Sequence, residues 1–537
     1  MIERAPPASG PLWLRAWRVR AASAWRRARA ALRRAELPLL LCCLLPWPAW
    51  ASDSATQDTG FARPGLSLLT PTDRGLRSDL AWLVDRGVLS VSLGTWPIPS
   101  SALRAAWATV DARSLDAADA DALARVQRAV RRSTDNVRIV ARVNSARQPS
   151  LDGGDAVRGT AGGSLGFYAG EPRWGGRLVL GTTADSLTPG GQQGNLDGSY
   201  LAVLLPGTVI AAGVTDRWWG PGQFTSPILS TAARPIAGLI VRRSEDTAPE
   251  ASWLKWIGPW GYEISAGRLA HYEPQGTRTF GLRVYARPWP NVEIGASNSL
   301  LWAGQGRPHD WVAFRDALLG NSNIDDPTTQ GSDPSDGVAG FDLRVSAANP
   351  WGGSWVAYLH LTGEDEAGSL PTKMFGTVGV QGKAVFARQR FEATLEATDT
   401  MLDRLFGAGS YEPPSPAYTH GTYVEGYYQG RLPIGAPIGG GGQFYALGLG
   451  WTPVDDPGQL RVFGSLFRGR ASETGPQSIN AAFGAPGTLS GFSLALDGET
   501  PGGVKWQVGL SVQHYPGGDR PLLGLQAGID VPILTGR

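Results

Sequence analysis

The chain has 537 residues, of which 42% are hydrophobic and 18% charged, and its formal net charge is +2. The apolar content excludes a wholly disordered chain, and the near-neutral charge gives no support for nucleic-acid binding. With 72 glycines and 40 prolines, the composition favours many short strands and tight turns over a helical fold.

The first 51 residues are predicted to be a secretory signal peptide. An arginine-rich region precedes a short apolar run, Leu39–Leu45, and the small-residue pattern Ala49-Trp50-Ala51 follows. The apolar run is shorter than the roughly 20 residues that a membrane-spanning helix needs. Both cysteines, Cys42 and Cys43, lie in this segment, so we expect a mature chain without disulfides or thiolate ligands. Because nine arginines and two glutamates leave with the segment, the predicted mature chain has a net charge of about −5.

Residues 52–136 are predicted to form a periplasmic three-helix domain, because apolar residues recur there at helical spacing. The three apolar faces are Leu76, Leu80, Leu83 and Val84; Leu103, Trp107 and Val110; and Leu123, Val126 and Val130. Ser114 is expected to cap the third helix. Three short helices bury little surface by themselves, so we expect them to lean on the rest of the protein.

From Asn136 onward the apolar period becomes two, and residues 137–537 are predicted to form an outer-membrane β-barrel. Many segments between Val137 and Ile533 run about 9–11 residues, the length of a tilted membrane-spanning strand. Along Arg388–Thr398, charged and polar residues share one face and apolar residues the other. A soluble β-sandwich or propeller would show the same alternation over shorter strands. Signal peptide, strand length and strand number together favour the membrane barrel.

The predicted fold class is an all-β transmembrane barrel of about 18 antiparallel strands with a small N-terminal α-helical bundle. About nineteen candidate strands can be traced, but a bacterial barrel needs an even number. We resolve this by treating Met401–Gly442 as one external loop. Tight turns at Pro288–Asn291 and Asp455–Gly458 are then periplasmic, and the long connections Ala303–Gly337 and Gly469–Leu489 are external.

The segment Asp216–Pro235 is too aromatic to lie free in water, because exposed apolar patches usually mark a contact. It contains Trp218-Trp219 followed by a Gly-Pro-Gly turn. We expect this external loop to fold inward and close the lumen, with Arg217 and Arg234 paired to lumen carboxylates. The alternative is that the two tryptophans contact a ligand directly.

Several short motifs resemble the capsule assembly Wzi family of outer-membrane proteins. They are Thr95–Pro99; Trp218–Gly222 with Ser230 and Ala233–Pro235; Trp253-Leu254 leading into Gly258–Trp260; Ala339–Asp342; and Gly363–Glu366. The resemblance implies an 18-stranded barrel in the outer membrane with a periplasmic three-helix bundle. It also implies a lectin that holds capsular polysaccharide at the cell surface and is not an enzyme.

Sugars stack on aromatic rings, so aromatic and polar residues of the external loops are the candidate carbohydrate-binding residues. They are Trp302, His309, Trp311, Arg315, Tyr411 and Tyr418. The alternative interpretation places these aromatic residues in the girdle at the membrane interface. The expected partners are capsular or extracellular polysaccharide, outer-membrane lipid and the barrel assembly machinery, with no nucleic acid.

Two other functions stay open from the sequence. A diffusion channel would conduct ions and retain no polymer. A hydrolase could use Ser164, because Gly162–Gly166 fits the G-x-S-x-G pattern, although a strand-like segment follows where a nucleophile elbow needs a helix. The five histidines are scattered without metal-ligand spacing, so we expect no metal site and no cofactor.

Overall fold

The computed structural model describes residues 65–145, 151, 159–186, 193–319, 335–367, 370–402, 405–407, 415–471, 483, 485–518 and 520–534. All of them belong to one compact unit, Ala62–Arg537. The predicted signal peptide, residues 1–51, lies outside the described residues. Among the described residues, no helix is long and apolar enough to cross a membrane.

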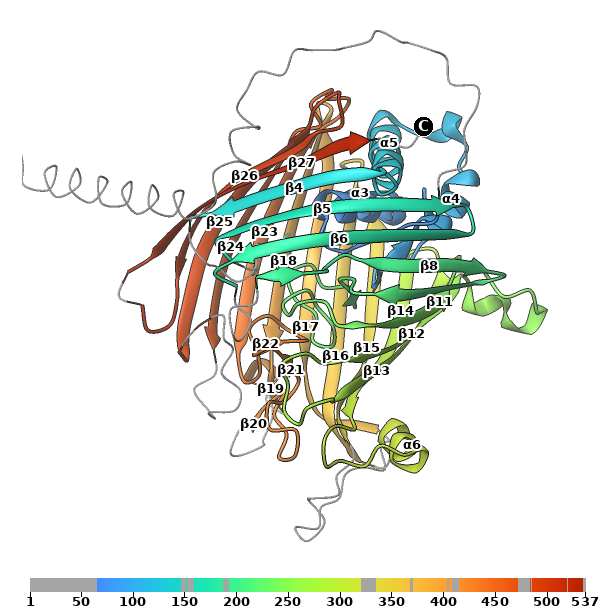
Figure 1. Cartoon of the computed structure of the whole chain (residues 1–537). Helices are drawn as coiled ribbons and strands as arrows, with labels where there is room; N and C mark the ends of the chain where they lie inside the picture. Colours follow the sequence, from blue (N-terminus) through green and yellow to red (C-terminus); the bar gives the residue numbers. More distant parts are fainter. Residues whose placement is uncertain are drawn as a thin grey trace, which may run out of the picture. The chain divides into compact units, whose positions relative to one another are not determined.

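The dominant element is a closed antiparallel barrel in which each strand pairs with its neighbour in the chain and β27 closes on β4 (Figure 1). Its strands are β4 (Val137–Asn144), β5 (Ala161–Glu171), β6 (Trp174–Ala184), β7 (Gly194–Asn195), β8 (Tyr200–Leu205), β9 (Thr208–Gly213), β11 (Ala237–Arg243), β12 (Trp260–Arg268), β13 (Arg278–Trp289), β14 (Val292–Trp302), β15 (Ser335–Ala348), β16 (Ser354–Ala367), β17 (Leu370–Phe386), β18 (Gln389–Asp399), β23 (Gln443–Pro453), β24 (Arg461–Ala471), β25 (Gly487–Glu499), β26 (Lys505–His514) and β27 (Leu522–Leu534). Both β7 and β8 pair with β6, so they are two parts of one interrupted strand. The barrel therefore has 18 strands, and the predicted fold class is confirmed.

The described residues between β18 and β23 contribute no strand to the barrel. Their only strands are two-residue pairs, β19 (Met401–Leu402) with β20 (Ser415–Pro416) and β21 (Tyr428–Gln429) with β22 (Leu432–Pro433). Treating Met401–Gly442 as one loop was thus the correct way to reach an even strand number.

Side chains alternate between the lumen and the outside along each strand, as period two requires. On β18, Arg390 and Glu396 are buried on the lumen side, whereas Leu395 is 55% exposed on the outside. The apolar residues lie on the outside because that side faces lipid. The charged residues lie on the lumen side, where they pair with the parts of the chain that fill the lumen.

Within the described residues, three α-helices precede the barrel: α3 (Arg74–Asp85), α4 (Ser100–Ala108) and α5 (Ala117–Arg132). Figure 1 shows them at one end of the barrel, with α6 (Trp311–Leu319) at the other. The predicted cap of the third helix was wrong. Asp116 accepts a hydrogen bond from the Asp119 backbone N–H and caps α5, whereas Ser114 ends the short 3₁₀ turn η1 (Ala112–Ser114).

The N-terminal segment takes part in two small sheets, one within itself and one with a connection of the barrel. β1 (Leu68–Leu69) pairs with β3 (Ile98–Pro99), and β2 (Thr95–Trp96) pairs with β10 (Trp218–Trp219) from the connection between β9 and β11. The second pairing joins segments more than a hundred residues apart, so the N-terminal part and the barrel form one packed body.

Candidate functional site

The connection between β9 and β11 enters the lumen and meets the N-terminal segment there. Trp218 lies opposite Trp96 and Trp219 opposite Thr95, and the Gly220 N–H donates to the Gly94 carbonyl over 2.8 Å. Both tryptophans are 1% exposed. Trp218 packs in the apolar cluster of the helices, whereas Trp219 packs in the cluster formed by the opposite loops. The tryptophan pair therefore joins two cores.

The Gly-Pro-Gly turn brings this loop against the barrel wall. Gly220 has a φ of +107°, and a Cβ there would lie 2.3 Å from Nδ1 of His360 on β16. Position 220 thus requires glycine for its conformation and for its close approach to the wall.

A single carboxylate on β18 fixes the backbone that follows the turn. Glu396 accepts hydrogen bonds from the backbone N–H groups of Gln223 (2.6 Å), Phe224 (3.1 Å) and Thr225 (2.7 Å). The hydroxyls of Thr225 and Tyr358 donate to it as well, over 2.9 and 2.7 Å. These donors satisfy the oxygens of the buried carboxyl group, which would otherwise be costly to bury.

The connection between β18 and β23 packs against the first loop. Four tyrosines in it are at most 2% exposed: Tyr418, Tyr423, Tyr427 and Tyr428. The Tyr418 hydroxyl donates to the Pro227 carbonyl and accepts from the Ala436 N–H over 3.0 Å. The Ser230 N–H donates to the Ile434 carbonyl over 2.9 Å. The two loops thus form one aromatic plug.

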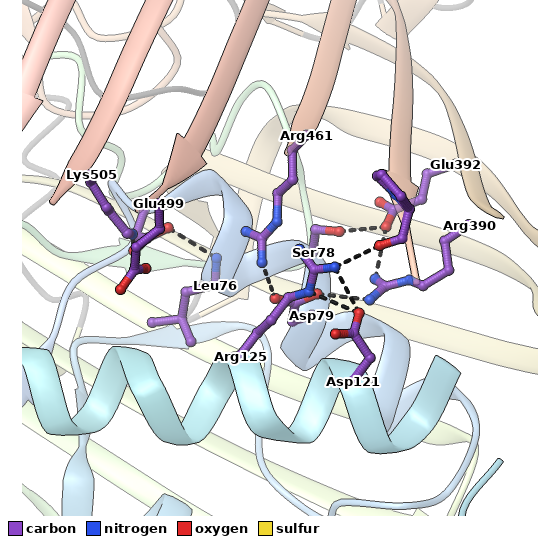
Figure 2. Close-up of polar contacts among 12 residues, drawn as sticks. Leu76, Ser78, Asp79, Asp121, Arg125, Arg390, Glu392, Arg461, Glu499 and Lys505 are labelled. Carbon is purple, nitrogen blue, oxygen red and sulfur yellow. Dashed lines mark hydrogen bonds and ion pairs between the residues drawn. The ribbon is translucent and has the colours of Figure 1, made fainter. Parts of the chain in front are cut away.

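From the other end, α3 is held in the barrel by buried ion pairs (Figure 2). Asp79, 1% exposed, accepts from Arg390 of β18 over 2.8 Å and from Arg461 of β24. The Ser78 hydroxyl donates to Glu392 of β18. A Cβ at position 75 would lie 1.5 Å from Nη1 of Arg461. The close approach of α3 to β24 therefore requires glycine at this position.

Two further carboxylates attach α3 to other strands around the mouth of the barrel. Asp85 at the end of α3 lies 2.6 Å from both Lys383 of β17 and Arg344 of β15. Burial opposes its ionisation, but the two cations outweigh burial and hold the pKa of Asp85 below its ordinary value. Asp73 before α3 lies 2.7 Å from Lys505 of β26. The three aspartates therefore attach α3 to five strands of the wall: β15, β17, β18, β24 and β26.

The plug leaves a polar cavity of about 420 Å³ along the wall from β26 through β4 to β6. Arg138, Arg142 and Arg177 line it, and glycines of the neighbouring strands make room for their side chains. Arg138 pairs with Asp530 of β27. Arg177 makes no hydrogen bond or ion pair within the part of the chain that the structure describes.

The plug residues proposed from the sequence lie at different positions in this assembly. Trp218 and Trp219 occupy the junction described above. Arg234 pairs with Asp197, with nitrogen–oxygen distances of 3.0 and 2.9 Å. Arg217 is buried; burial lowers its pKa, and the charge of Glu263 on β12 opposes that effect.

Five of the six candidate carbohydrate residues divide into three groups. Trp311 and Arg315 of α6 are exposed, by 72% and 52% respectively, and His309 before the helix is exposed too. Tyr411 lies outside the described residues. Tyr418 is fully buried in the plug, so its selection was wrong: the loop that carries it folds into the lumen, where its ring cannot stack on a sugar.

Trp302 supports the girdle interpretation. It ends β14 on the outward side, and its ring packs 4.9 Å from that of Phe314 of α6, centroid to centroid. Phe280 of β13, also outward, lies 5.1 Å from Phe314. Trp302 and Phe280 thus seat α6 against the outer wall, and Trp311 is the aromatic residue of this group that stays open to solvent.

The hydrolase pattern falls inside a strand. Ser164 lies within β5, opposite Gly181 of β6, and no helix follows it. That is not the strand–turn–helix geometry of a nucleophile elbow. Within the described residues, no group of three or more His, Asp, Glu or Cys side chains could hold a metal ion.

Sequence reasoning missed the partners of the lumen charges. The alternation along Arg388–Thr398 places Arg390 and Glu396 on one face, but nothing local connects them to Asp79 or to Gln223. The sequence signal that could have indicated these partners is the regular spacing of Asp73, Asp79 and Asp85. These residues lie on a segment that was expected to pack against a charged lumen.

Known proteins of similar sequence and structure agree with this fold. The profile of the family described as capsule assembly protein Wzi matches residues 126–460. An uncharacterized 55.8 kDa protein from the cps region of Klebsiella pneumoniae is 31% identical over 468 residues, covering 87% of this chain and 89% of that protein. The solved structure of Wzi from Escherichia coli, an outer-membrane protein involved in group 1 capsule assembly and a carbohydrate-binding β-barrel, superposes with a TM-score of 0.76. It is 28% identical, and the match covers 87% of this chain and all of that one.

Proposed function

Because the chain belongs to the Wzi family of capsule assembly proteins, we propose that it is a lectin-like protein that binds capsular or extracellular polysaccharide. It helps to anchor or assemble that polymer at the cell surface. The protein lies in the outer membrane, and we infer that its helical N-terminal part is on the periplasmic side. The observation that best supports the proposal is the similarity of this chain to a carbohydrate-binding barrel.

The filled lumen supports this function over transport of large solutes. Loops from the external end and α3 from the periplasmic end meet at Trp218 and Trp219. A barrel filled in this way acts as a rigid support, and recognition then falls to the external connections.

We propose that Trp311, His309 and Arg315 contact the polymer. An exposed indole offers a face for sugar C–H groups, and the neighbouring cation and imidazole offer hydrogen bonds to hydroxyls or carboxylates. Trp302 acts indirectly by seating α6. No side chain is assigned a catalytic role.

The cavity beside Arg177 favours a second candidate, a narrow pathway for small anions. Planar-bilayer recordings separate the two functions. A diffusion channel gives steady conductance that falls in Arg177→Gln, whereas a plugged lectin gives none.

The test is deletion of the gene in the producing strain, with polymer measured separately on cells and in the medium. Deletion should shift polymer into the medium while the total is unchanged. Complementation with Trp311→Ala should restore retention only in part. Trp253→Ala is the matched control, because Trp253 is 74% exposed on the periplasmic connection between β11 and β12. Unchanged cell-bound polymer in the deletion strain would refute the proposal.

A further inference from the structure

The outer wall of the barrel has a concave face between β16 and β26. An apolar groove of about 1010 Å³ lies there, lined on the outside by residues of β17, β18 and β23–β26. Its floor is a row of directly paired side chains running from strand to strand: Leu395, Leu447, Leu466, Phe492 and Val512. Leu395 and Leu466 are more than half exposed, so this row is open to the lipid phase.

A polar row borders the groove at its external end. Tyr445 pairs with Arg468, Arg468 with Ser490, and Ser490 with His514. The four residues belong to adjacent strands, so the row spans roughly 14 Å at about 4.8 Å per strand. All four line the groove.

The row lies near the external ends of its strands. β23 and β25 begin there, and β24 and β26 end there, next to the external connections. Arg468 points outward, because the neighbouring Phe467 packs in the lumen core. Within the described part of the chain, Arg468 has no hydrogen-bond or ion-pair partner. Arg470 is the next outward-facing residue of β24 and lies just beyond the row, where it adds a second cation.

We propose that this groove binds one acylated, phosphorylated glycolipid of the outer leaflet, a lipid of the lipid A class. Acyl chains fill the groove over Leu395 and Leu466, and a head-group phosphate lies on Arg468 and His514. Two features select this occupant. The groove continues the lipid-facing surface of the barrel, and the cations meet it at the depth where an anionic head group sits. An arginine binds phosphate through paired, charge-assisted hydrogen bonds.

Delipidated, detergent-solubilised protein is titrated with Kdo2-lipid A and examined by native mass spectrometry. One lipid per barrel is expected to bind ahead of any further lipids. Removing its phosphates, or replacing it with phosphatidylethanolamine, should weaken binding about tenfold or more, since a charge-assisted hydrogen bond contributes that much. The tetra-acylated precursor should bind more weakly than the hexa-acylated lipid, because it leaves part of the groove empty.

Arg468→Gln should reproduce the effect of removing the phosphates. Arg278→Gln is the matched control, because Arg278 is an exposed outward arginine at the external end of β13 on another part of the wall. Folding of each variant is checked by its heat-modifiable gel mobility. Equal binding to wild type, Arg468→Gln and Arg278→Gln would mean a general lipid shell and overturn the proposal. Paired barrels in lipid-free detergent, dispersed by Leu466→Ala, would identify the groove as a contact between copies and would also overturn it.

Discussion

Replacing Asp79 with alanine should release α3 from the barrel mouth. Asp79 is the shared partner of Arg390, which is fully buried, and of Arg461, which is nearly so. Removing the carboxylate leaves two buried guanidinium groups side by side, of which Arg390 keeps a 3.3 Å contact with Glu392. The helix then loses its central contact with β18 and β24, while the contacts of Asp73 and Asp85 persist.

The magnitude follows from the burial of the partners. Deleting one member of a buried ion pair costs about 3–5 kcal/mol, because the remaining charge is uncompensated. At about 1.4 kcal/mol for each factor of ten, a loss of about 4 kcal/mol increases the population with displaced helices roughly a thousandfold. Asp79→Asn keeps a hydrogen-bond acceptor for one arginine and should lose less.

Two assays report this change. Urea unfolding followed by tryptophan fluorescence should show an early transition of the plug, since Trp82 of α3 and Trp218 both lie in the helical cluster. Planar-bilayer recordings should show intermittent openings that wild type lacks. The control is Asp316→Ala, which removes a pair with Arg315 that is 52% and 28% exposed; such surface pairs contribute about 0–1 kcal/mol. An Asp79→Ala protein that unfolds at the wild-type urea concentration and stays closed would refute the reasoning.

Three other perturbations test separate parts of the plug. The pKa of Asp85 is held below its ordinary value of 3.8, so the pair stabilises docking above that pH and is lost as the pH falls through the lowered pKa. The wild-type urea midpoint should therefore fall below about pH 4, and Asp85→Asn should reduce that dependence while lowering the midpoint at pH 7; the lowered pKa of Asp73 accounts for part of the dependence that remains. Gly220→Ala should destabilise the plug by about 1–3 kcal/mol through its positive φ and its contact with His360; a wild-type midpoint would contradict this. Glu396→Ala leaves three backbone N–H groups without their acceptor and should expose Gln223–Thr225 to proteolysis in intact barrels, whereas Glu392→Ala should not.

The barrel was predictable because its signals are local. Alternation, strand length and turn residues recur in every strand, and the requirement for an even number settled the one ambiguous stretch. The helices were equally visible, although the cap of α5 shifted by two residues to Asp116, because both Ser114 and Asp116 suit that role and only the backbone decides between them.

The contents of the lumen were only partly predictable. The aromatic character of Asp216–Pro235 indicated an inward loop, but its partners lie far away in the sequence, as with Thr95 and Glu396. Tyr418 shows the limit of the argument. An aromatic residue in an external loop has the same local sequence whether it faces solvent or folds into the lumen, and only the packing of a second loop decides the outcome.

The division of Trp218 and Trp219 between two cores has a consequence for assembly. The external loop reaches its packed position only together with β2, since each tryptophan lies opposite a residue of that strand. The N-terminal segment and the external loop therefore depend on each other for their final positions. A defect in the helices at one end of the barrel is therefore expected to displace the loops at the other end.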